Sequence, residues 1–265
     1  DLLYTIFTLK SLCRAREILI KERSKFAVLL TIELDKSFPE IKPFFNNMIS
    51  TTLLYILEKY TNTKHIATMK DYDSIRKISH GKFTYAKFAQ LKELAKNSVG
   101  FHKENTDLLI STYVSIYNDF NNKIDPIEKQ ISTIIKVLNP RMLTIPGIGE
   151  ISAASILAEY GDIKNFSSPN KMLAFAGLDP SINQSGTLES YGKMVKHGSG
   201  HLRYAIMNSA MSILRFSPEF YDYYLKKRSE GKFHRVALSH VCKKVIRVIY
   251  TLEKNDIDFN PSLLR

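Results

Sequence analysis

The sequence predicts a mainly α-helical protein, in which a long helical region of coiled-coil or hairpin type precedes an α-helical domain with a glycine-rich loop. Apolar residues recur at helical spacing along residues 2–34 and at near-heptad spacing along residues 104–138. Beyond residue 139, serine–proline pairs and glycines stand where helices would begin and end. Eight of the eleven glycines lie between residues 143 and 203, which marks backbone that turns sharply or approaches another group closely. We therefore expect two parts, residues 1–138 and residues 139–265.

The first part should be helical throughout. Residues 2–34 are predicted to form one long helix, and Phe38-Pro39 ends its apolar pattern. Shorter helices are expected around residues 47–60 and 84–97, with a loop near His80-Gly81. Residues 35–100 hold no motif that indicates chemistry, so a helical core with a solvated basic face is the interpretation there.

A near-heptad seam runs through residues 104–138. Its apolar members stand three or four residues apart and are Leu109, Tyr113, Ile116, Phe120, Ile124, Ile127, Ile131, Ile134 and Leu138. This spacing is typical of a coiled coil or a long helical hairpin, and the partner is either residues 2–34 of the same chain or another subunit. Pro126 lies inside the seam and has no N–H for a helical hydrogen bond, so we expect a kink or a restart there.

Residues 140–161 indicate two short helices joined by Pro146-Gly147-Ile148-Gly149. Asn139-Pro140 opens the first helix and Gly161 ends the second, an order that resembles the helix-hairpin-helix motif of DNA-binding proteins. A glycine turn lets backbone N–H groups at a helix N-terminus meet a phosphate, so Gly147, Ile148 and Gly149 are candidate DNA contacts. Valine at either glycine should then weaken DNA binding and keep the fold. The alternative is a glycine-linked corner within a helical core.

A glycine-flanked serine and several cations follow. Ser168-Pro169 begins a helix that Gly177 ends, and a polar loop then leads to Ser185-Gly186. Lys193, Lys196 and Arg203 come after it, around a Gly198-Ser199-Gly200 turn. A serine on a flexible loop beside cations and a helix N-terminus can attack a phosphate while the developing charge is stabilised, although such a pair is more often a simple turn. Further helices are predicted at residues 200–215, 218–230 and 233–253.

The order of these motifs, PGIGxxxAxxILAExGD, FxxPxKxxAFAGLDP, SG and KxGSxxLR, resembles the C-terminal domain of a class of insertion-sequence transposases over about residues 140–250. Members of that class join an N-terminal RuvC-like domain with a DEDD acidic tetrad to a C-terminal domain with a catalytic serine. The class includes the bridge-RNA-guided recombinases and is related to the Piv-type DNA invertases. The resemblance maps the nucleophilic serine onto Ser185, and basic residues onto Lys196 and Arg203.

The resemblance implies a cytoplasmic DNA transposase or site-specific recombinase that cleaves and rejoins DNA through a phosphoserine intermediate. It also implies a homo-oligomer, dimer or tetramer, held by coiled-coil helices, and a structured guide RNA as a further partner. The RuvC-like domain would carry the divalent metal, Mg²⁺, but residues 1–100 lack four spaced carboxylates on strands. The chain begins at Asp1 rather than Met, so we expect a fragment or processed chain with no cofactor or metal of its own, inactive without the RuvC-like half.

Charge and composition agree with a nucleic-acid partner. The net charge is +12, the isoelectric point is about 9.5, and residues 186–247 hold twelve Lys or Arg against four Asp or Glu. No apolar run is long enough to span a membrane, and Cys13 and Cys242 lack metal-ligand spacing. His197 and His201 are separated by glycines, which argues against a helical metal pair. Tyrosines of the 218–230 segment can stack on bases or simply pack: Tyr221, Tyr223 and Tyr224.

Two other classes remain open. One is a non-catalytic nucleic-acid-binding module, such as the remnant of a decayed element. The other is a helix-hairpin-helix DNA-repair glycosylase, which needs a catalytic Asp about twenty residues beyond the hairpin. Asp162 is too near for that role and Asp179 is too far, so this class ranks last. If Ser185 is not the nucleophile, Ser181 and Ser190 are the neighbouring serines to examine.

Overall fold

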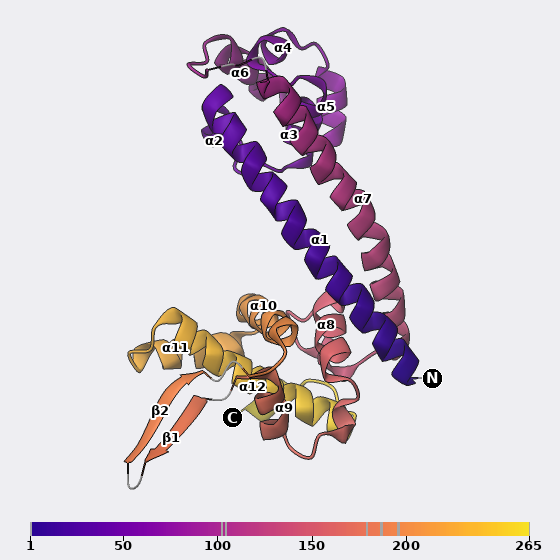
Figure 1. Ribbon diagram of the computed structural model, residues 1–265, viewed down its shortest axis with the longest axis vertical. Helices are drawn as coiled ribbons and strands as arrows, with labels where there is room; N and C mark the ends of the chain where they lie inside the picture. Colours follow the sequence, from indigo (N-terminus) through magenta and orange to yellow (C-terminus); the bar gives the residue numbers. More distant parts are fainter. Residues whose placement is uncertain are drawn as a thin grey trace. The chain divides into compact units, whose positions relative to one another are not determined.

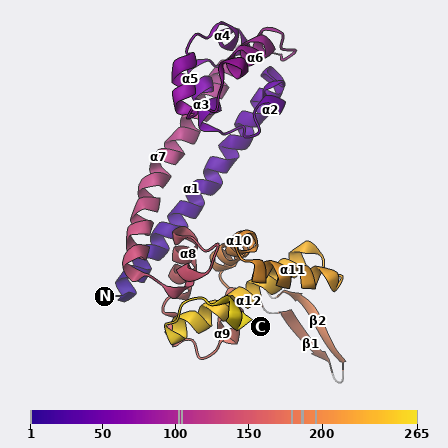
Figure 2. The same cartoon turned by 180° about the vertical axis from the view of Figure 1, so that it is seen from behind.

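The structure is a computed structural model that describes residues 2–101, 103, 105–178, 180–185, 188–194 and 197–264, without the side chains of residues 180–185, 188–194 and 263. It is mainly α-helical, which confirms the predicted fold class (Figures 1 and 2). The chain divides into two compact units, Asp1–Arg16 with Ile127–Arg265, and Glu17–Pro126. This division differs from the expected boundary near residue 139, because the two longest helices contribute to both units.

Helices α1 (Leu2–Ser37) and α7 (Thr106–Leu138) run antiparallel and side by side within each unit (Figure 1). In the first unit Leu9 packs against Ile131 and Ile135, and in the second Leu30 packs in one core with Ile110. The intrachain partner that the sequence left open is therefore α1. The predicted restart is wrong, since α7 continues as one helix through Pro126.

The buried face of α7 differs from the predicted seam in the second unit. Ile110, Val114 and Tyr117 are buried there, each one residue after its predicted counterpart, whereas Leu109, Tyr113 and Ile116 are only partly buried. At this end α7 shares a core with the short helices between α1 and α7 as well as with α1, so its buried face is turned toward them. Further along, the predicted Ile124 and Ile131 are buried as expected.

The second unit closes a core over α1 and α7 with short helices. These are α2 (Ile41–Phe44), α3 (Thr51–Lys59), α4 (Thr63–Thr68), α5 (Tyr72–Ile78) and α6 (Tyr85–Lys96). Side chains of Ser50, Asn62 and Thr84 accept hydrogen bonds from backbone N–H groups in the first turns of α3, α4 and α6, which explains where these helices begin. The helices predicted around residues 47–60 and 84–97 are thus confirmed.

The first unit builds its core around α12 (His234–Asn255), which contacts η1 (Arg141–Thr144), η2 (Ile163–Asn165), α9 (Pro169–Ala176), α10 (Gly200–Phe216) and α11 (Pro218–Ser229). Helix α8 (Glu150–Tyr160) packs on α10, and η3 (Pro261–Leu264) follows α12. Every helix predicted beyond residue 145 is present within two residues of its expected bounds. Within the described residues, no helix is long and apolar enough to cross a membrane.

The sequence did not predict the two-stranded antiparallel sheet of β1 (Pro180–Ser185) and β2 (Leu188–Met194). Ser185 pairs with Leu188 and Pro180 with Met194, with an irregularity between Pro180 and Ile182. The polar loop expected before Ser185 is therefore a strand. The segment alternates weakly and is rich in Ser, Asn and Gln, so its period-2 signal is hard to recognise.

Candidate functional site

The glycine hairpin begins with a single 3₁₀ turn, η1, rather than with an α-helix. Gly147 then takes φ +98°, and a Cβ built there would lie 2.7 Å from Ile213 Cα and 2.8 Å from Ile213 N on α10. Gly147 therefore lets the hairpin turn pack directly on the backbone of α10. Gly149 differs, because a Cβ there would meet no atom within 4 Å.

The middle of the hairpin turn is also occupied by packing. Ile148 is 6% exposed and belongs to the core of the first unit, and its backbone N–H donates to the carbonyl of Ile145 at 3.0 Å. At the start of α8, Glu150 accepts a hydrogen bond from Ser132 and lies 3.5 Å from Lys136 Nζ. These contacts hold the pKa of Glu150 below its usual range. Glu150 thus supplies a carboxylate in the first turn of α8, which competes with a phosphate for the helix N-terminus.

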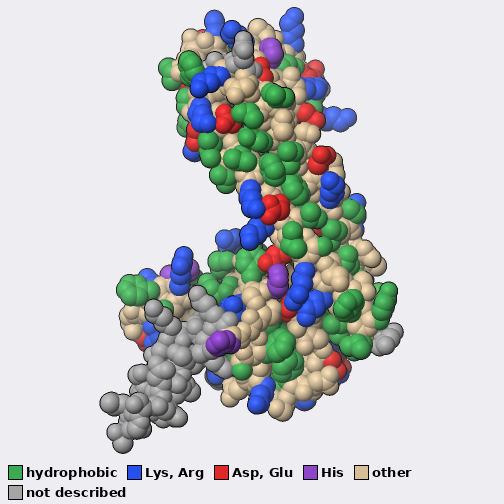
Figure 3. All heavy atoms as spheres, in the orientation of Figure 1, with side chains coloured by type: hydrophobic (Ala, Val, Ile, Leu, Met, Phe, Trp, Pro, Cys, Tyr) green, Lys and Arg blue, Asp and Glu red, His purple; other side chains and the backbone are tan. Residues whose placement is uncertain are grey.

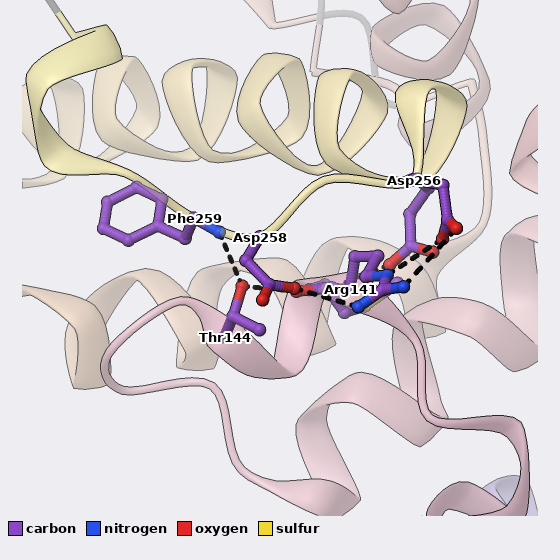
Figure 4. A network of polar contacts seen from close by, with 7 residues as sticks. Arg141, Thr144, Asp256, Asp258 and Phe259 are labelled. Carbon is purple, nitrogen blue, oxygen red and sulfur yellow. Dashed lines mark hydrogen bonds and ion pairs between the residues drawn. The ribbon is translucent and has the colours of Figure 1, made fainter.

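A polar clasp ties η1 to the segment after α12 (Figure 4). Arg141 Nε donates to Asp256 Oδ1 at 2.9 Å and Arg141 Nη1 donates to Asp258 Oδ1 at 3.0 Å. The backbone N–H of Phe259 donates to Thr144 Oγ1 at 2.8 Å. Hydrogen bonding to Arg141 lowers the pKa of Asp256. The clasp fixes the first half of the hairpin, and it neutralises the arginine nearest to the turn.

The predicted nucleophile Ser185 and one of its predicted cations, Lys193, lie in the β1–β2 sheet. Ser185 is the last residue of β1, and Lys193 lies in β2; their side chains are outside the described residues. Lys196 lies outside the described residues altogether. The expected flexible loop at Ser185 is thus replaced by the end of a strand, because its backbone pairs with that of Leu188. The assignment of Ser185 as nucleophile stays a prediction.

The start of α10 is packed tightly against the end of α9. A Cβ on Gly198 would lie 2.4 Å from the carbonyl oxygen of Phe175 and 2.8 Å from the backbone nitrogen of Gly177. The guanidinium of Arg203 donates from Nη1 to the carbonyl of Ala176 at 3.1 Å. Ser199 caps α10, accepting a hydrogen bond from the N–H of Leu202 at 3.2 Å. Arg203 therefore closes the C-terminal end of α9 and keeps part of its guanidinium on a protein acceptor.

A buried carboxylate joins this helix start to α8 and α1. Glu159 is 6% exposed and accepts two hydrogen bonds from Arg14, at 2.8 and 3.1 Å, and one from Ser199 Oγ at 2.8 Å. Lys10 Nζ lies 3.7 Å from the same carboxylate. Burial alone would raise the pKa of Glu159, but the hydrogen bonds from Arg14 and Ser199 and the charges of Arg14 and Lys10 outweigh it and lower the pKa.

Helices α11 and α12 form a groove of about 620 Å³ that is lined by basic side chains and by an aromatic ring. Residues 218–247, which span most of both helices, hold eight Lys or Arg against three Asp or Glu. Lys244 Nζ lies 4.5 Å from the ring centre of Tyr223, and burial together with the charge of Lys226 lowers the pKa of Lys244. The groove is lined by Glu219, Asp222, Tyr223, Lys226, Lys244, Arg247, Val248 and Leu264.

Sequence reasoning missed the Glu159 network and the Arg141 clasp. The partners of Glu159 are 145 and 40 residues away, and those of Arg141 are 115 and 117 residues away, so no local spacing announces them. A serine before a helix start was the only available signal for Ser199. Within the part of the chain that the structure describes, no group of three or more His, Cys, Asp or Glu side chains is placed to hold a metal ion.

Part of the chain is similar to a known protein family. Residues 139–225, which include the hairpin, the sheet and the start of α10, match the model of the Transposase IS116/IS110/IS902 family. The chain is 26% identical over 148 residues to an uncharacterized 43.6 kDa protein of insertion element IS110 from Streptomyces coelicolor, covering 55% of this chain and 36% of that protein. It is 30% identical over 124 residues to the transposase for insertion sequence element IS1111A from Coxiella burnetii, covering 46% and 34%.

A third relative is named for gene inversion. The pilin gene-inverting protein of Moraxella bovis is 27% identical over 187 residues, covering 65% of this chain and 58% of that protein. The chain therefore spans between about a third and three fifths of the length of these relatives. Residues 139–225 are therefore similar to the Transposase IS116/IS110/IS902 family, and the chain also resembles a pilin gene-inverting protein.

Proposed function

We infer, from the match of residues 139–225 to the Transposase IS116/IS110/IS902 family, that this chain is part of a DNA transposase or site-specific recombinase. The family match is the observation that carries the proposal. Relatives named as a transposase and as a pilin gene-inverting protein match parts of this chain, and both names imply DNA as the substrate. DNA is therefore the proposed partner of this chain.

The proposed DNA-binding surface is the face formed by α11 and α12. Lys226, Lys244 and Arg247 line one groove with Tyr223, and its cations exceed its two acids. Phosphates are bound mainly by Lys and Arg, with release of counterions, and tyrosine rings stack on bases. Lys193, Lys196 and Arg203, which follow Ser185 in the sequence, are the further proposed DNA contacts.

The proposed reaction is strand cleavage and rejoining by Ser185. Its hydroxyl oxygen would attack a DNA phosphodiester, losing its proton and forming a phosphoserine ester while the leaving 3′-oxygen takes up a proton. A hydroxyl of a second DNA end would later displace the serine, so no external energy source is needed. The resembled family supplies the divalent metal, Mg²⁺, from a RuvC-like domain, and a structured RNA as guide; for this chain both remain part of the proposal.

Self-association is the second element of the proposal. Leu2, Leu3, Tyr4 and Phe7 at the start of α1 are each more than half exposed, with Leu3 at 75%. Figure 3 shows hydrophobic side chains gathered on the face around the chain's N-terminus. Such apolar surface favours a protein contact. Phe7→Glu should shift any dimer or tetramer of this chain toward monomer in sedimentation experiments, and an unchanged distribution would argue against this contact.

The DNA proposal is tested by charge reversal. Affinity for duplex DNA should fall steeply between low and physiological salt, since each neutralised phosphate releases counterion. The double variant Lys226→Glu with Arg247→Glu should weaken binding at least 10-fold and flatten that salt dependence. Lys87→Glu with Lys96→Glu makes the same charge change on exposed positions of α6 and is the matched control. Equal losses in both variants would contradict a specific surface on α11 and α12.

The nucleophile is tested in a full-length protein that carries this region. Ser185→Ala should abolish both recombination and the covalent protein–DNA adduct while DNA binding is kept. A normal adduct in that variant would remove Ser185 from the proposal and direct attention to Ser181 or Ser190. DNA binding without any adduct in the unaltered protein would instead favour a non-catalytic nucleic-acid-binding module.

A further inference from the structure

Glu159 lies where the two ends of the β1–β2 sheet meet the helices. Strand β1 begins three residues after Gly177, and α10 begins six residues after the end of β2. A Cβ on Gly198 would lie 2.8 Å from the nitrogen of Gly177, so the chain entering β1 and the chain leaving β2 meet at these two glycines. We call Gly177, Gly198 and Ser199 the base of the β1–β2 hairpin.

Three contacts hold this base. Gly198 packs on the backbone of Phe175, the Ser199 N–H donates to the carbonyl of Phe175 at 3.4 Å, and Arg203 donates to Ala176 at 3.1 Å. These contacts all come from α9. A fourth contact, the hydrogen bond from Ser199 Oγ to Glu159, comes from α8, and through Arg14 it continues to α1.

Glu159 fixes the orientation of the Ser199 hydroxyl by accepting its hydrogen bond. A hydroxyl has one proton to donate and two lone pairs to accept with. Glu159 takes the proton at 2.8 Å, which turns a lone pair toward the N–H of Leu202 at the start of α10. The carboxylate also meets Arg14 with both oxygens, and charge-assisted pairs of this kind are the strong and directional ones. Rotation of the carboxylate would therefore break at least one of these hydrogen bonds.

We propose that Glu159 is a positioning residue for the serine reaction: it holds Ser199, and so sets the direction in which the β1–β2 hairpin carries Ser185. This rests on the proposed function, in which Ser185 is the nucleophile. A nucleophile must be held in line with its phosphate, and small displacements cost large factors in rate. The position of the Glu159 carboxylate also depends on α1, because the guanidinium of Arg14 on that helix donates to both of its oxygens. Glu159 itself touches neither DNA nor the reacting atoms.

Glu159→Gln is the informative substitution because it keeps the shape of the side chain. One oxygen becomes an NH₂ group, which is a donor: facing Arg14 it meets another donor, and facing Ser199 it reverses the hydrogen bond, so that residue 159 no longer accepts the hydroxyl proton. Arg14 has 44% of its side chain exposed, so the guanidinium can return to water and the fold should survive. Glu128→Gln is the matched control, because it removes an Arg–carboxylate pair between α1 and α7, Arg16 Nε to Glu128 Oε1 at 2.6 Å, away from the hairpin base.

The experiment has two readouts. In this chain, hydrogen–deuterium exchange of the Leu202 and Arg203 amides should become at least 10-fold faster in Glu159→Gln and in Ser199→Ala, and not in Glu128→Gln. In a full-length protein carrying this region, the rate of adduct formation at saturating DNA should fall at least 10-fold in Glu159→Gln with DNA affinity within about 2-fold. Ser199→Thr, which keeps the hydroxyl, should restore most of the rate lost in Ser199→Ala.

The outcomes separate the two proposals. Unchanged exchange in Glu159→Gln, or an adduct rate that falls no more than in Glu128→Gln, overturns the role of Glu159 and leaves the serine reaction standing. Absence of any adduct in the unaltered full-length protein overturns the serine reaction, and the role of Glu159 in it falls as well. Faster exchange together with a slower adduct rate, and rescue by Ser199→Thr, supports the proposal.

Discussion

The first unit contains two Gly-X-Gly turns, Gly147-Ile148-Gly149 before α8 and Gly198-Ser199-Gly200 at the start of α10, and they differ in what they leave accessible. In both turns the first glycine is required by a close backbone approach, and a Cβ on the second would meet nothing closer than 3.9 Å. In the first turn the middle residue is a core side chain, whereas in the second it is Ser199, bonded to Glu159.

The charge around the two turns differs as well. Glu150 follows Gly147-Ile148-Gly149 and places a carboxylate at the N-terminus of α8. The first helical turn of α10, by contrast, contains His201 and no acidic residue, and Arg203 follows. A helix N-terminus attracts anions, and a carboxylate already there competes with a phosphate. A Gly-X-Gly pattern alone therefore does not identify a phosphate site. Gly147-Ile148-Gly149 serves packing, whereas Gly198-Ser199-Gly200 begins a helix with polar and basic side chains beside it.

The largest effect is expected from Gly147→Val. The side chain would meet the α10 backbone at 2.7 Å, and Gly147 has φ +98°. Strain of about 1–3 kcal/mol and overpacking of about 1–3 kcal/mol should both lower the free energy of unfolding. Gly161→Val, at φ +72° with open space around the Cβ, is the control for the φ cost alone. Equal urea midpoints for the two variants would show that the approach of α10 is unimportant.

That prediction reverses the expectation drawn from the sequence, which was that valine at Gly147 would keep the fold. The helix bounds were predictable because caps, prolines and glycines are local signals: α9 ends at Gly177 and α11 begins at Pro218 as expected. The function of Gly147 was not predictable, because it depends on Ile213, 66 positions further along the chain. Glu159 was missed for the same reason, since its partners lie on α1 and at the start of α10.

The next effect in size concerns the second turn. Gly198→Ala should destabilise the chain by about 1–3 kcal/mol, because its Cβ would lie 2.4 Å from a backbone oxygen that has to move. Gly200→Ala is the matched control and should change the free energy of unfolding by less than about 0.5 kcal/mol, since the nearest atom is a guanidinium nitrogen at 3.9 Å. Urea unfolding of both variants checks this. An unchanged free energy of unfolding in Gly198→Ala would show that the base of the β1–β2 hairpin is not tightly packed.

A smaller effect should appear in the pH dependence of stability. The partners of Glu159 lower its pKa below its ordinary value of 4.5, so the folded state favours the charged form. The stabilisation is complete above that ordinary value and is lost as pH falls through the lowered pKa of the folded state. Glu159→Gln should therefore be less stable than the unaltered chain at pH 7, and the difference should shrink below pH 4. A difference that stays constant down to pH 3 would contradict the charged network.

The smallest effect on stability, and the sharpest test of the first turn, is Gly149→Val. Gly149 has φ −91° and ψ 171°, which valine adopts readily, and a Cβ there meets no atom within 4 Å. The free energy of unfolding should change by less than about 1 kcal/mol. If the hairpin amides contact phosphate, the added side chain should weaken duplex DNA binding at least 5-fold in a folded protein. Because Glu150 occupies the start of α8 and Ile148 donates its N–H to Ile145, we expect the loss to be smaller than for Lys226→Glu with Arg247→Glu. Binding unchanged from the unaltered chain would make the first turn a structural corner, and a loss larger than that of the double charge reversal would restore it as the main contact.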